Sequence, residues 1–129
     1  MNSISIKNLS FSYRNSNDKA LDNISLDIHC GEFVTLMGRS GAGKSTLCRC
    51  LNGIIPNFQK GDIDGDIQIF GQSIKGKKIF EIAQDVGLVF QDFESQLFST
   101  NVELEVAFCP ENLAVPREEI ALRVRSALQ

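Results

Sequence analysis

Residues 38–46 read Gly-Arg-Ser-Gly-Ala-Gly-Lys-Ser-Thr, and this stretch decides the fold. It matches the phosphate-binding pattern G-x-x-x-x-G-K-[ST] at every defined position. Residues 33–37, just before it, are apolar apart from one threonine, which is typical of a buried parallel strand. Leu47 and Leu51, just after it, are four residues apart and precede Asn52-Gly53, a pattern that predicts a helix and its end. The sequence therefore predicts a strand, a glycine-rich loop and a helix in the order that the motif needs.

Each residue type in this loop has a chemical role toward a bound polyphosphate. Glycines lack a Cβ, so the backbone can approach a phosphate closely, and the N–H groups and helix dipole favour an anion there. We predict that Lys44 binds the β- and γ-phosphates, that Ser45 coordinates Mg²⁺ and that Thr46 contacts the α-phosphate. The alternative, a chance glycine-rich turn before a helix, is disfavoured because the motif is complete and in context. The predicted nucleotide-binding residues of the loop are Gly38, Ser40, Gly41, Ala42, Gly43, Lys44, Ser45 and Thr46.

Composition limits the class of protein and its partners. The 129 residues suffice for one modest domain or part of one, and a hydrophobic content of 43% suits a packed core. The net charge is −3 and no basic stripe exists, so nucleic acid is not expected as a partner. No apolar run approaches the roughly 20 residues that span a bilayer, and the first residues lack the apolar region of a signal peptide. We expect a cytosolic chain whose link to a membrane runs through a partner.

The cysteines and the single histidine are interpreted as structural. Cys48 and Cys50 are two residues apart on the predicted helix and point to different faces, which is poor geometry for a shared metal. Cys30 and Cys109 stand alone in the sequence. Reduced thiols are the expected state of all four. His29 precedes a Gly-Glu turn and is predicted to end a strand rather than to act as a base.

The first 30 residues predict a small antiparallel β-layer. Ile4 and Ile6 alternate with polar residues, whereas Leu9, Phe11 and Tyr13 alternate in the opposite phase. This pattern indicates one long strand with a bulge near residues 7–8. A turn at residues 15–18 and a second alternation over residues 24–28 predict its antiparallel partner.

The middle of the chain predicts one further exposed strand and one further buried strand. Residues 54–60 are predicted to form a loop, residues 66–71 a half-exposed strand, and residues 80–83 a short helix. Val-Gly-Leu-Val-Phe at residues 86–90 has the composition of a second buried strand, which ends at Gln91.

The last 30 residues predict two helices. Thr100 with Glu103 forms a possible capping box, Val102 and Val106 share a face, and Pro110 is expected to end the first helix. Pro116 opens the second helix, in which a stripe predicted to pack in the core consists of Ile120, Val124, Ala127 and Leu128. No C-cap or return strand follows within these residues, so we expect the sequence to be truncated.

Together these features resemble a known family. Tyr13, the turn at 31–32, the loop at 38–46 and the run at 86–91 resemble the N-terminal half of an ABC transporter ATP-binding subunit, over essentially the whole chain. Residues 92–99 and 105–113 are similar to the energy-coupling-factor group of vitamin and metal importers, although Cys109 stands where a glycine is usual. The insertion at 55–65 is also similar to ATPases of that group, some of which carry two fused ATPase halves.

The resemblance implies a fold class and a domain division. The expected fold is α/β: the N-terminal part of a P-loop NTPase core, with an antiparallel β-subdomain and the start of a helical subdomain. Residues 1–91 would hold the β-layer and the core up to the end of the second buried strand. Residues 92–129 would begin the helical subdomain, so the fold would be incomplete. An isolated chain of this kind is expected to expose apolar surface and to be poorly soluble.

The resemblance also implies roles outside the loop. Tyr13 would stack on the adenine of ATP; a core aromatic residue is the alternative. Gln91 would contact Mg²⁺ or the attacking water and so would act in catalysis with Lys44; an ordinary strand-end amide is the alternative. Residues 92–99 would face a membrane subunit, with Phe93, Leu97 and Phe98 either as interface anchors or as core.

The implied function is that of the ATP-binding, energy-coupling component of a transporter. Its cofactors would be ATP and Mg²⁺, and its partners a second ATPase subunit or half and an integral membrane subunit, at the inner face of the cell membrane. Within these 129 residues there is no Leu-Ser-Gly-Gly-Gln signature, no apolar strand ending in Asp-Glu and no switch histidine. Because phosphoryl transfer depends on such groups, the chain is expected to bind Mg-ATP weakly and not to hydrolyse it.

Two classes of function remain open on the sequence. The first is the N-terminal part of a transport ATPase, and the second is a truncated nucleotide-binding module without catalysis. A P-loop kinase or small GTPase lacks support, because no Asn/Thr-Lys-x-Asp guanine-binding motif is present.

Overall fold

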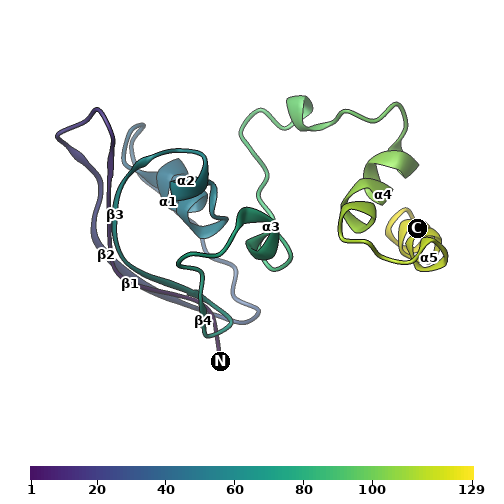
Figure 1. The fold of residues 1–129 in the computed structure, drawn as a ribbon, viewed down its shortest axis with the longest axis horizontal. Coiled ribbons are helices and arrows are strands. Elements are labelled where there is room, and N and C mark those ends of the chain that lie inside the picture. The colour runs from purple at the N-terminus through teal and green to yellow at the C-terminus, as the bar shows by residue number, and fades with distance from the viewer. The chain divides into compact units, whose positions relative to one another are not determined.

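A computed structural model describes all residues from Met1 to Gln129. The chain forms two compact units, Met1–Leu88 and Val89–Gln129, which are described separately below (Figure 1). The sequence-based domain boundary after residue 91 stays a prediction.

A four-stranded antiparallel sheet dominates the first unit. Its strands are β1 (Asn2–Tyr13), β2 (Lys19–His29), β3 (Gly61–Ile69) and β4 (Gln72–Ser73), in the order β2-β1-β3-β4. The predicted antiparallel pair at the N-terminus is confirmed, and β2 ends at His29 as expected. β3 begins at Gly61, five residues before the predicted strand, because its first residues pair with the end of β1.

The predicted bulge in β1 is present and decides which side chains are buried. Asn8 has a φ of 51°, and the register with β2 shifts between Ile6 and Leu9. Because of this extra residue, Ile6 and Leu9 are both buried, although an uninterrupted strand would point them to opposite faces. The hydroxyl of Ser25 accepts the N–H of Asn8 at 2.9 Å, so the displaced backbone group keeps a partner.

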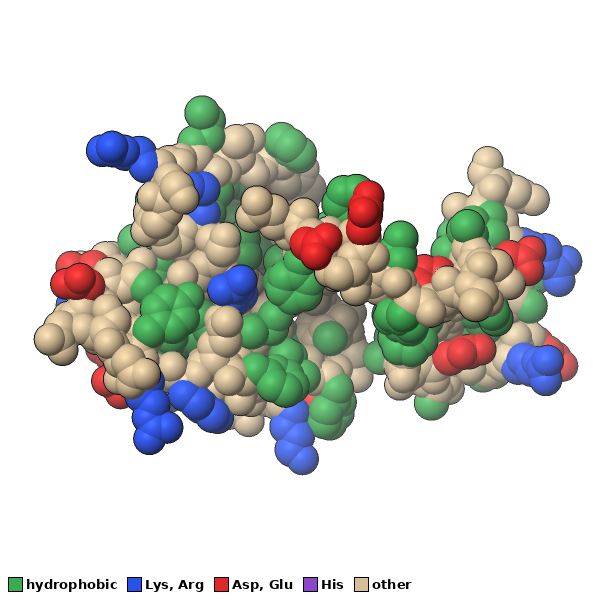
Figure 2. Space-filling model, turned by 90° about the horizontal axis from the view of Figure 1, so that it is seen from above, with side chains coloured by type: hydrophobic (Ala, Val, Ile, Leu, Met, Phe, Trp, Pro, Cys, Tyr) green, Lys and Arg blue, Asp and Glu red, His purple; other side chains and the backbone are tan.

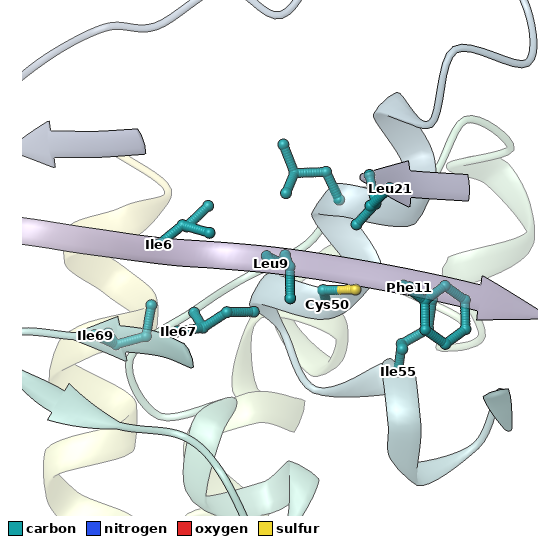
Figure 3. Packing of buried hydrophobic residues seen from close by; sticks show 9 residues of the cluster. Ile6, Leu9, Phe11, Leu21, Cys50, Ile55, Ile67 and Ile69 are labelled. Carbon is teal, nitrogen blue, oxygen red and sulfur yellow. The ribbon is translucent and has the colours of Figure 1, made fainter. Parts of the chain in front are cut away.

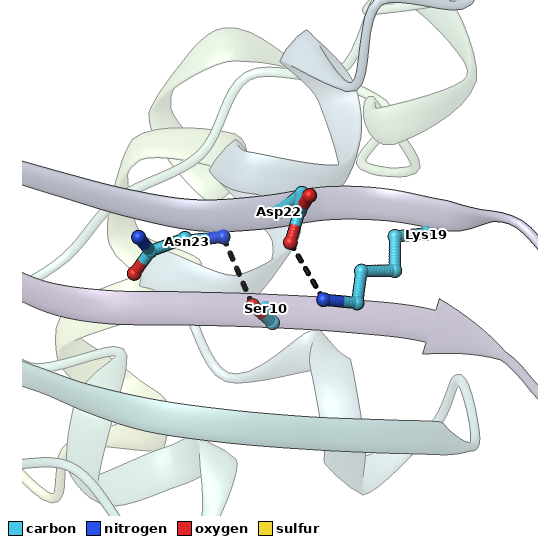
Figure 4. Close-up of polar contacts among 4 residues, drawn as sticks. All are labelled: Ser10, Lys19, Asp22 and Asn23. Carbon is cyan, nitrogen blue, oxygen red and sulfur yellow. Dashed lines mark hydrogen bonds and ion pairs between the residues drawn. The ribbon is translucent and has the colours of Figure 1, made fainter.

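A second irregularity lies close by on the neighbouring strand. Asn23 of β2 also has a φ of 51°, and its N–H donates to the hydroxyl of Ser10 at 2.9 Å (Figure 4). In the same view, Lys19 and Asp22 form an exposed ion pair at 2.6 Å. Side-chain hydroxyls therefore accept these two backbone N–H groups where the register between β1 and β2 shifts.

The core of the first unit lies between this sheet and the helix that follows the loop. Helix α1 spans Lys44–Leu51, as predicted, with its C-cap at Asn52. Figure 3 shows Cys50 of α1 close to Leu9 and Phe11 of β1. Burial raises the pKa of the Cys50 thiol to about 12. The buried hydrophobic cluster consists of Ile6, Leu9, Phe11, Leu21, Leu47, Cys50, Ile55, Ile67 and Ile69.

Two short helices complete the first unit. Residues 54–60, predicted as a loop, contain α2 (Ile54–Asn57), and Ile55 packs in the core. This prediction was wrong in part, although Ile55 itself has extended backbone angles (φ −98°, ψ 128°) that interrupt the short helix. Helix α3 spans Ile79–Ile82 and confirms the short helix predicted near residues 80–83. Ile82 is buried.

The two predicted buried strands are not formed. Residues 33–37 and 86–90 have no regular secondary structure. Phe33 is 95% exposed, Met37 85% and Val89 79%. No strand of the sheet pairs with either segment, and an apolar strand buried on both faces needs such neighbours. In Figure 2, hydrophobic side chains are visible on the surface of both units.

The second unit contains a 3₁₀ turn at Glu94–Gln96 and two helices, α4 (Val102–Asn112) and α5 (Arg117–Ala127). The helices pack on each other, with Ala107 and Ile120 buried. Of the predicted core stripe on α5, Ile120 is buried and Val124 is partly buried, whereas Ala127 and Leu128 are exposed. No helix of the chain has the length and apolar character needed to cross a membrane.

Two details of α4 differ from the sequence prediction. Asn101, not Thr100, is the N-cap, and its side-chain oxygen accepts the N–H of Leu104 at 2.8 Å. Pro110 lies inside the helix rather than ending it, because the N–H of Leu113 still reaches the carbonyl of Cys109 at 3.1 Å. Pro110 lacks the N–H that would donate to the carbonyl four residues earlier, yet the helix continues for two more residues.

The carboxylate of Glu105 fastens the preceding segment to α4. It accepts the backbone N–H of Ser99 at 2.9 Å and that of Phe98 at 3.3 Å. These hydrogen bonds, chiefly those from Ser99, hold the pKa of Glu105 below its ordinary value. The phenyl rings of Phe98 and Phe108 pack edge to face, with centroids 4.4 Å apart.

Candidate nucleotide-binding site

The glycine-rich loop ends where it meets the first residues of β2. Gly43 is the N-cap of α1, with a φ of 88°, and its carbonyl accepts the N–H of Leu47 at 2.9 Å. A Cβ at Gly43 would lie 2.4 Å from the carbonyl oxygen of Ala20. Both the left-handed backbone and the close contact therefore require glycine here. The same contact fixes the start of α1 against the sheet.

The ammonium group of Lys44 closes over the loop. Its Nζ donates to the carbonyl oxygens of Gly38 and Arg39, each at 2.8 Å, and the N–H of Ala42 donates to the carbonyl of Arg39 at 3.1 Å. An ammonium group has three donors, so one remains for an incoming oxygen. The lysine is thus held at the mouth of the loop with its positive charge available to an anion.

The start of α1 supplies further donors. The first N–H groups of a helix have no partner within it, and Gly43 has no side chain that could cap them. No acidic residue lies in the first turn of the helix, and Ser45 is exposed. This donor set fits a phosphate chain, because its members are N–H, ammonium and hydroxyl groups next to the positive end of a helix dipole. Ser45 is the residue of the loop that could coordinate Mg²⁺.

Tyr13 connects the end of β1 to α1. Its Oη lies 2.9 Å from Oγ1 of Thr46, and its ring packs edge to face on Phe11 with centroids 4.8 Å apart. Thr46 is only 7% exposed. Sequence reasoning singled out both residues but missed their hydrogen bond, because the pattern gives no signal for a pair 33 residues apart.

A shallow hollow lies beside Tyr13. It is lined by Tyr13, Arg14, Asn15, Ser16, Gln59 and Lys60. The amide oxygen of Gln59 accepts from Arg49 of α1 at 3.5 Å. Sequence reasoning missed Arg14, Gln59 and Lys60, since only the pairing of Tyr13 with Gly61 brings these strand ends together.

The remaining predicted site residues belong to the second unit, so the structure does not group them with the loop. Gln91 is exposed and has no regular secondary structure. Phe93, Leu97 and Phe98 are each more than half exposed, at 57%, 61% and 62%. Phe98 packs against Phe108 within the second unit, whereas Phe93 and Leu97 stay exposed; both alternatives for these side chains remain predictions.

Comparison with known proteins assigns the family. The ABC transporter family profile matches residues 21–128. The chain belongs to this family. It is 50% identical over 127 residues to a protein of Caldanaerobacter subterraneus named as an ABC transporter ATP-binding protein, covering 98% of this chain and 22% of that one. A protein of Pyrococcus abyssi with the same description is 44% identical over 129 residues, covering 100% of this chain and 46% of that one.

A solved structure has the same fold over nearly the whole chain. It is cbiO1 from Clostridium perfringens, described as part of the ABC transporter complex cbiONQ. The TM-score is 0.82 at 33% sequence identity, covering 98% of this chain and 49% of that one. The resemblance to the N-terminal half of an ABC transporter ATP-binding subunit, proposed from the sequence, is thereby confirmed. This ABC ATPase chain spans between about a fifth and a half of the length of these relatives.

Proposed function

We propose that this chain is the Mg-ATP-binding part of an ABC transporter ATPase subunit, which couples hydrolysis to a membrane partner in the intact subunit. The observation that carries the proposal is the loop geometry. Lys44 is held 2.8 Å from two loop carbonyls, at the start of a helix whose first N–H groups are uncapped. This arrangement presents positive charge and convergent donors to a polyphosphate.

The individual roles follow the order of groups along ATP. Tyr13 would stack on the adenine, and the hollow beside it would receive the base and ribose. Residues 38–46 would bind the phosphates, with Lys44 at the β- and γ-phosphates. Ser45 and Gln91 would hold Mg²⁺, and Gln91 would also orient the attacking water.

The membrane partner would bind the second unit. The segment 92–99 exposes Phe93, Leu97 and Phe98, and large apolar side chains in water are typical of interface anchors. In this proposal the subunit pairs with a second ATPase subunit or half and lies at the cytoplasmic face of the membrane, bound to an integral membrane protein. The complex cbiONQ, which contains the similar protein cbiO1, is the precedent for such an assembly.

Binding of Mg-ATP by the chain is the direct test. Isothermal calorimetry should detect binding that Lys44→Ala weakens about ten- to a hundredfold, the loss expected for charged hydrogen bonds. Lys75→Ala is the matched control, because Lys75 is exposed and lies outside the loop. Equal affinity of wild type and Lys44→Ala would contradict the proposal.

The second candidate is a nucleotide-binding module without catalysis. It is favoured by the missing signature and Asp-Glu strand within these residues. A phosphate-release assay on the chain should show no turnover above buffer. Steady phosphate release that Lys44→Ala abolishes would exclude this candidate and place catalytic groups within the 129 residues.

A further inference from the structure

We infer that the hydroxyl of Tyr13 positions Thr46 for phosphate binding, so that this residue acts on the phosphate end of the nucleotide as well as on the base. The inference rests on the proposed function, since it assumes a polyphosphate in the loop. Its basis is the 2.9 Å contact between Oη of Tyr13 and Oγ1 of Thr46.

The contact joins two residues that other packing already fixes. Thr46 lies in the first turn of α1 and is 7% exposed, so its hydroxyl needs a partner within the protein. Tyr13 is the last residue of β1, and Phe11, which is 1% exposed, holds its ring edge to face. The hydrogen bond therefore joins a rigid strand end to the residue two positions after the loop lysine.

The direction of the hydrogen bond determines what Thr46 can do. A threonine hydroxyl has one proton and two acceptor lone pairs. When Tyr13 donates to Oγ1, the proton of Thr46 is free to donate to a phosphate oxygen, and the chain of two hydrogen bonds strengthens both. Tyr13 is thus a positioning residue for Thr46, and its ring remains available to the hollow lined by Arg14 and Lys60.

The composition of the chain allows a direct test. Tyr13 is the single tyrosine, and the chain has no tryptophan. The tyrosine absorption band and tyrosine fluorescence therefore report on the environment of Tyr13 alone. Tripolyphosphate is the probe, because it occupies the phosphate loop but has no base to stack on the ring.

We expect tripolyphosphate to change the tyrosine spectrum of the wild-type chain. Thr46→Val should abolish this change, whereas Thr46→Ser, which keeps the hydroxyl, should preserve it. In calorimetry, Tyr13→Phe should bind tripolyphosphate about three- to tenfold more weakly, the effect of one hydrogen bond. The loss should vanish in the Thr46→Val background, as a double-mutant cycle requires of a shared interaction.

Two results would overturn the inference while leaving the nucleotide site intact. One is tripolyphosphate binding without any change in the tyrosine spectrum. The other is a Tyr13→Phe chain that binds Mg-ATP more weakly but tripolyphosphate as well as wild type does, because the residue would then act on the base alone. If the wild-type chain binds neither ligand, the proposed function fails too. If circular dichroism shows that Thr46→Val does not fold, the test rests on the Tyr13→Phe variant alone. Its calorimetric affinities for tripolyphosphate and Mg-ATP then show whether Tyr13 acts on the phosphates or on the base alone.

Discussion

The two segments at 33–37 and 86–90 are more apolar than the antiparallel sheet with α1, yet the buried core comes from the sheet and its helices. Phe11 of β1 is 1% exposed, whereas Phe33 is 95% exposed. β1 has a hydrogen-bonded strand on each side, β2 and β3. Residues 33–37 have none, so their side chains have no layer to pack in. Apolar composition supplies the drive for burial, but pairing partners decide whether burial occurs.

The same comparison separates the two halves of the candidate site. Lys44, Thr46 and Tyr13 are fixed by the packed sheet and helix and by contacts of 2.8–2.9 Å. Gln91 follows one of the unpaired segments and has no regular structure. The part of the candidate site around the loop is thus held by the packing of the sheet on α1. The other half, Gln91, belongs to the second unit and follows a segment that pairs with no strand of the sheet.

The largest contrast is expected in thiol reactivity. Burial raises the pKa of Cys50 from 9.0 to about 12, which lowers its thiolate fraction about a thousandfold. Cys30 and Cys109 are exposed. Maleimide should therefore modify both exposed cysteines long before Cys50, as followed by peptide mass spectrometry. Equal rates of maleimide modification for Cys50 and Cys30 in the native chain would show that the packed region exposes Cys50 to solvent as freely as Cys30.

Truncation of one buried and one exposed phenylalanine compares what the packed and the unpaired regions contribute to the free energy of unfolding. Phe11→Ala should lower the free energy of unfolding by about 3–5 kcal/mol, because it empties a core position. Phe33→Ala removes the same atoms from an exposed position and should change that free energy by less than about 0.5 kcal/mol. Urea denaturation of the two variants measures both. A large loss for Phe33→Ala would mean that residues 33–37 are packed in solution.

Two loop glycines with similar backbone angles form a third matched pair. Gly43→Ala places a Cβ 2.4 Å from the carbonyl of Ala20, whereas a Cβ at Gly41 meets nothing within 4 Å. Both have left-handed φ values, 88° and 83°, so each substitution strains the backbone by about 1 kcal/mol. Because of the added clash, Gly43→Ala should lower the free energy of unfolding by about 1–2 kcal/mol more than Gly41→Ala does, as measured by thermal or urea unfolding. Equal losses would place the loop away from β2.

The smallest expected effect concerns Asp66 of β3. Hydrogen bonds from the hydroxyl of Ser73 and then from the amide of Gln68 hold the pKa of Asp66 below 3.8. A lowered pKa in the folded state adds stability above pH 3.8, which is lost as the pH falls through the folded value. Asp66 is largely solvated, so Asp66→Asn should cost only about 0.5 kcal/mol at neutral pH. In urea titrations this difference should shrink below pH 4; a constant difference would exclude the carboxylate as its cause.

Sequence reasoning succeeded where a short pattern fixes the local geometry. The loop at 38–46, the helix after it and the bulge near Asn8 follow from glycine positions, spacing and a change of phase. It failed where distant partners decide, because the hydrogen bond between Tyr13 and Thr46, 33 residues apart, had no sequence signal. The cap of α4 is a local error: Asn101, not Thr100, accepts the N–H of Leu104, three residues on.

The sequence by itself determined the family, the glycine-rich loop with the helix after it, and the antiparallel start of the fold, because each rests on residue type and near-neighbour spacing. Only the tertiary structure decided which apolar segments are buried and which hydroxyl faces Thr46. Burial and side-chain hydrogen bonds depend on residues far apart in the chain, and their placement emerges only when strands and helices pack.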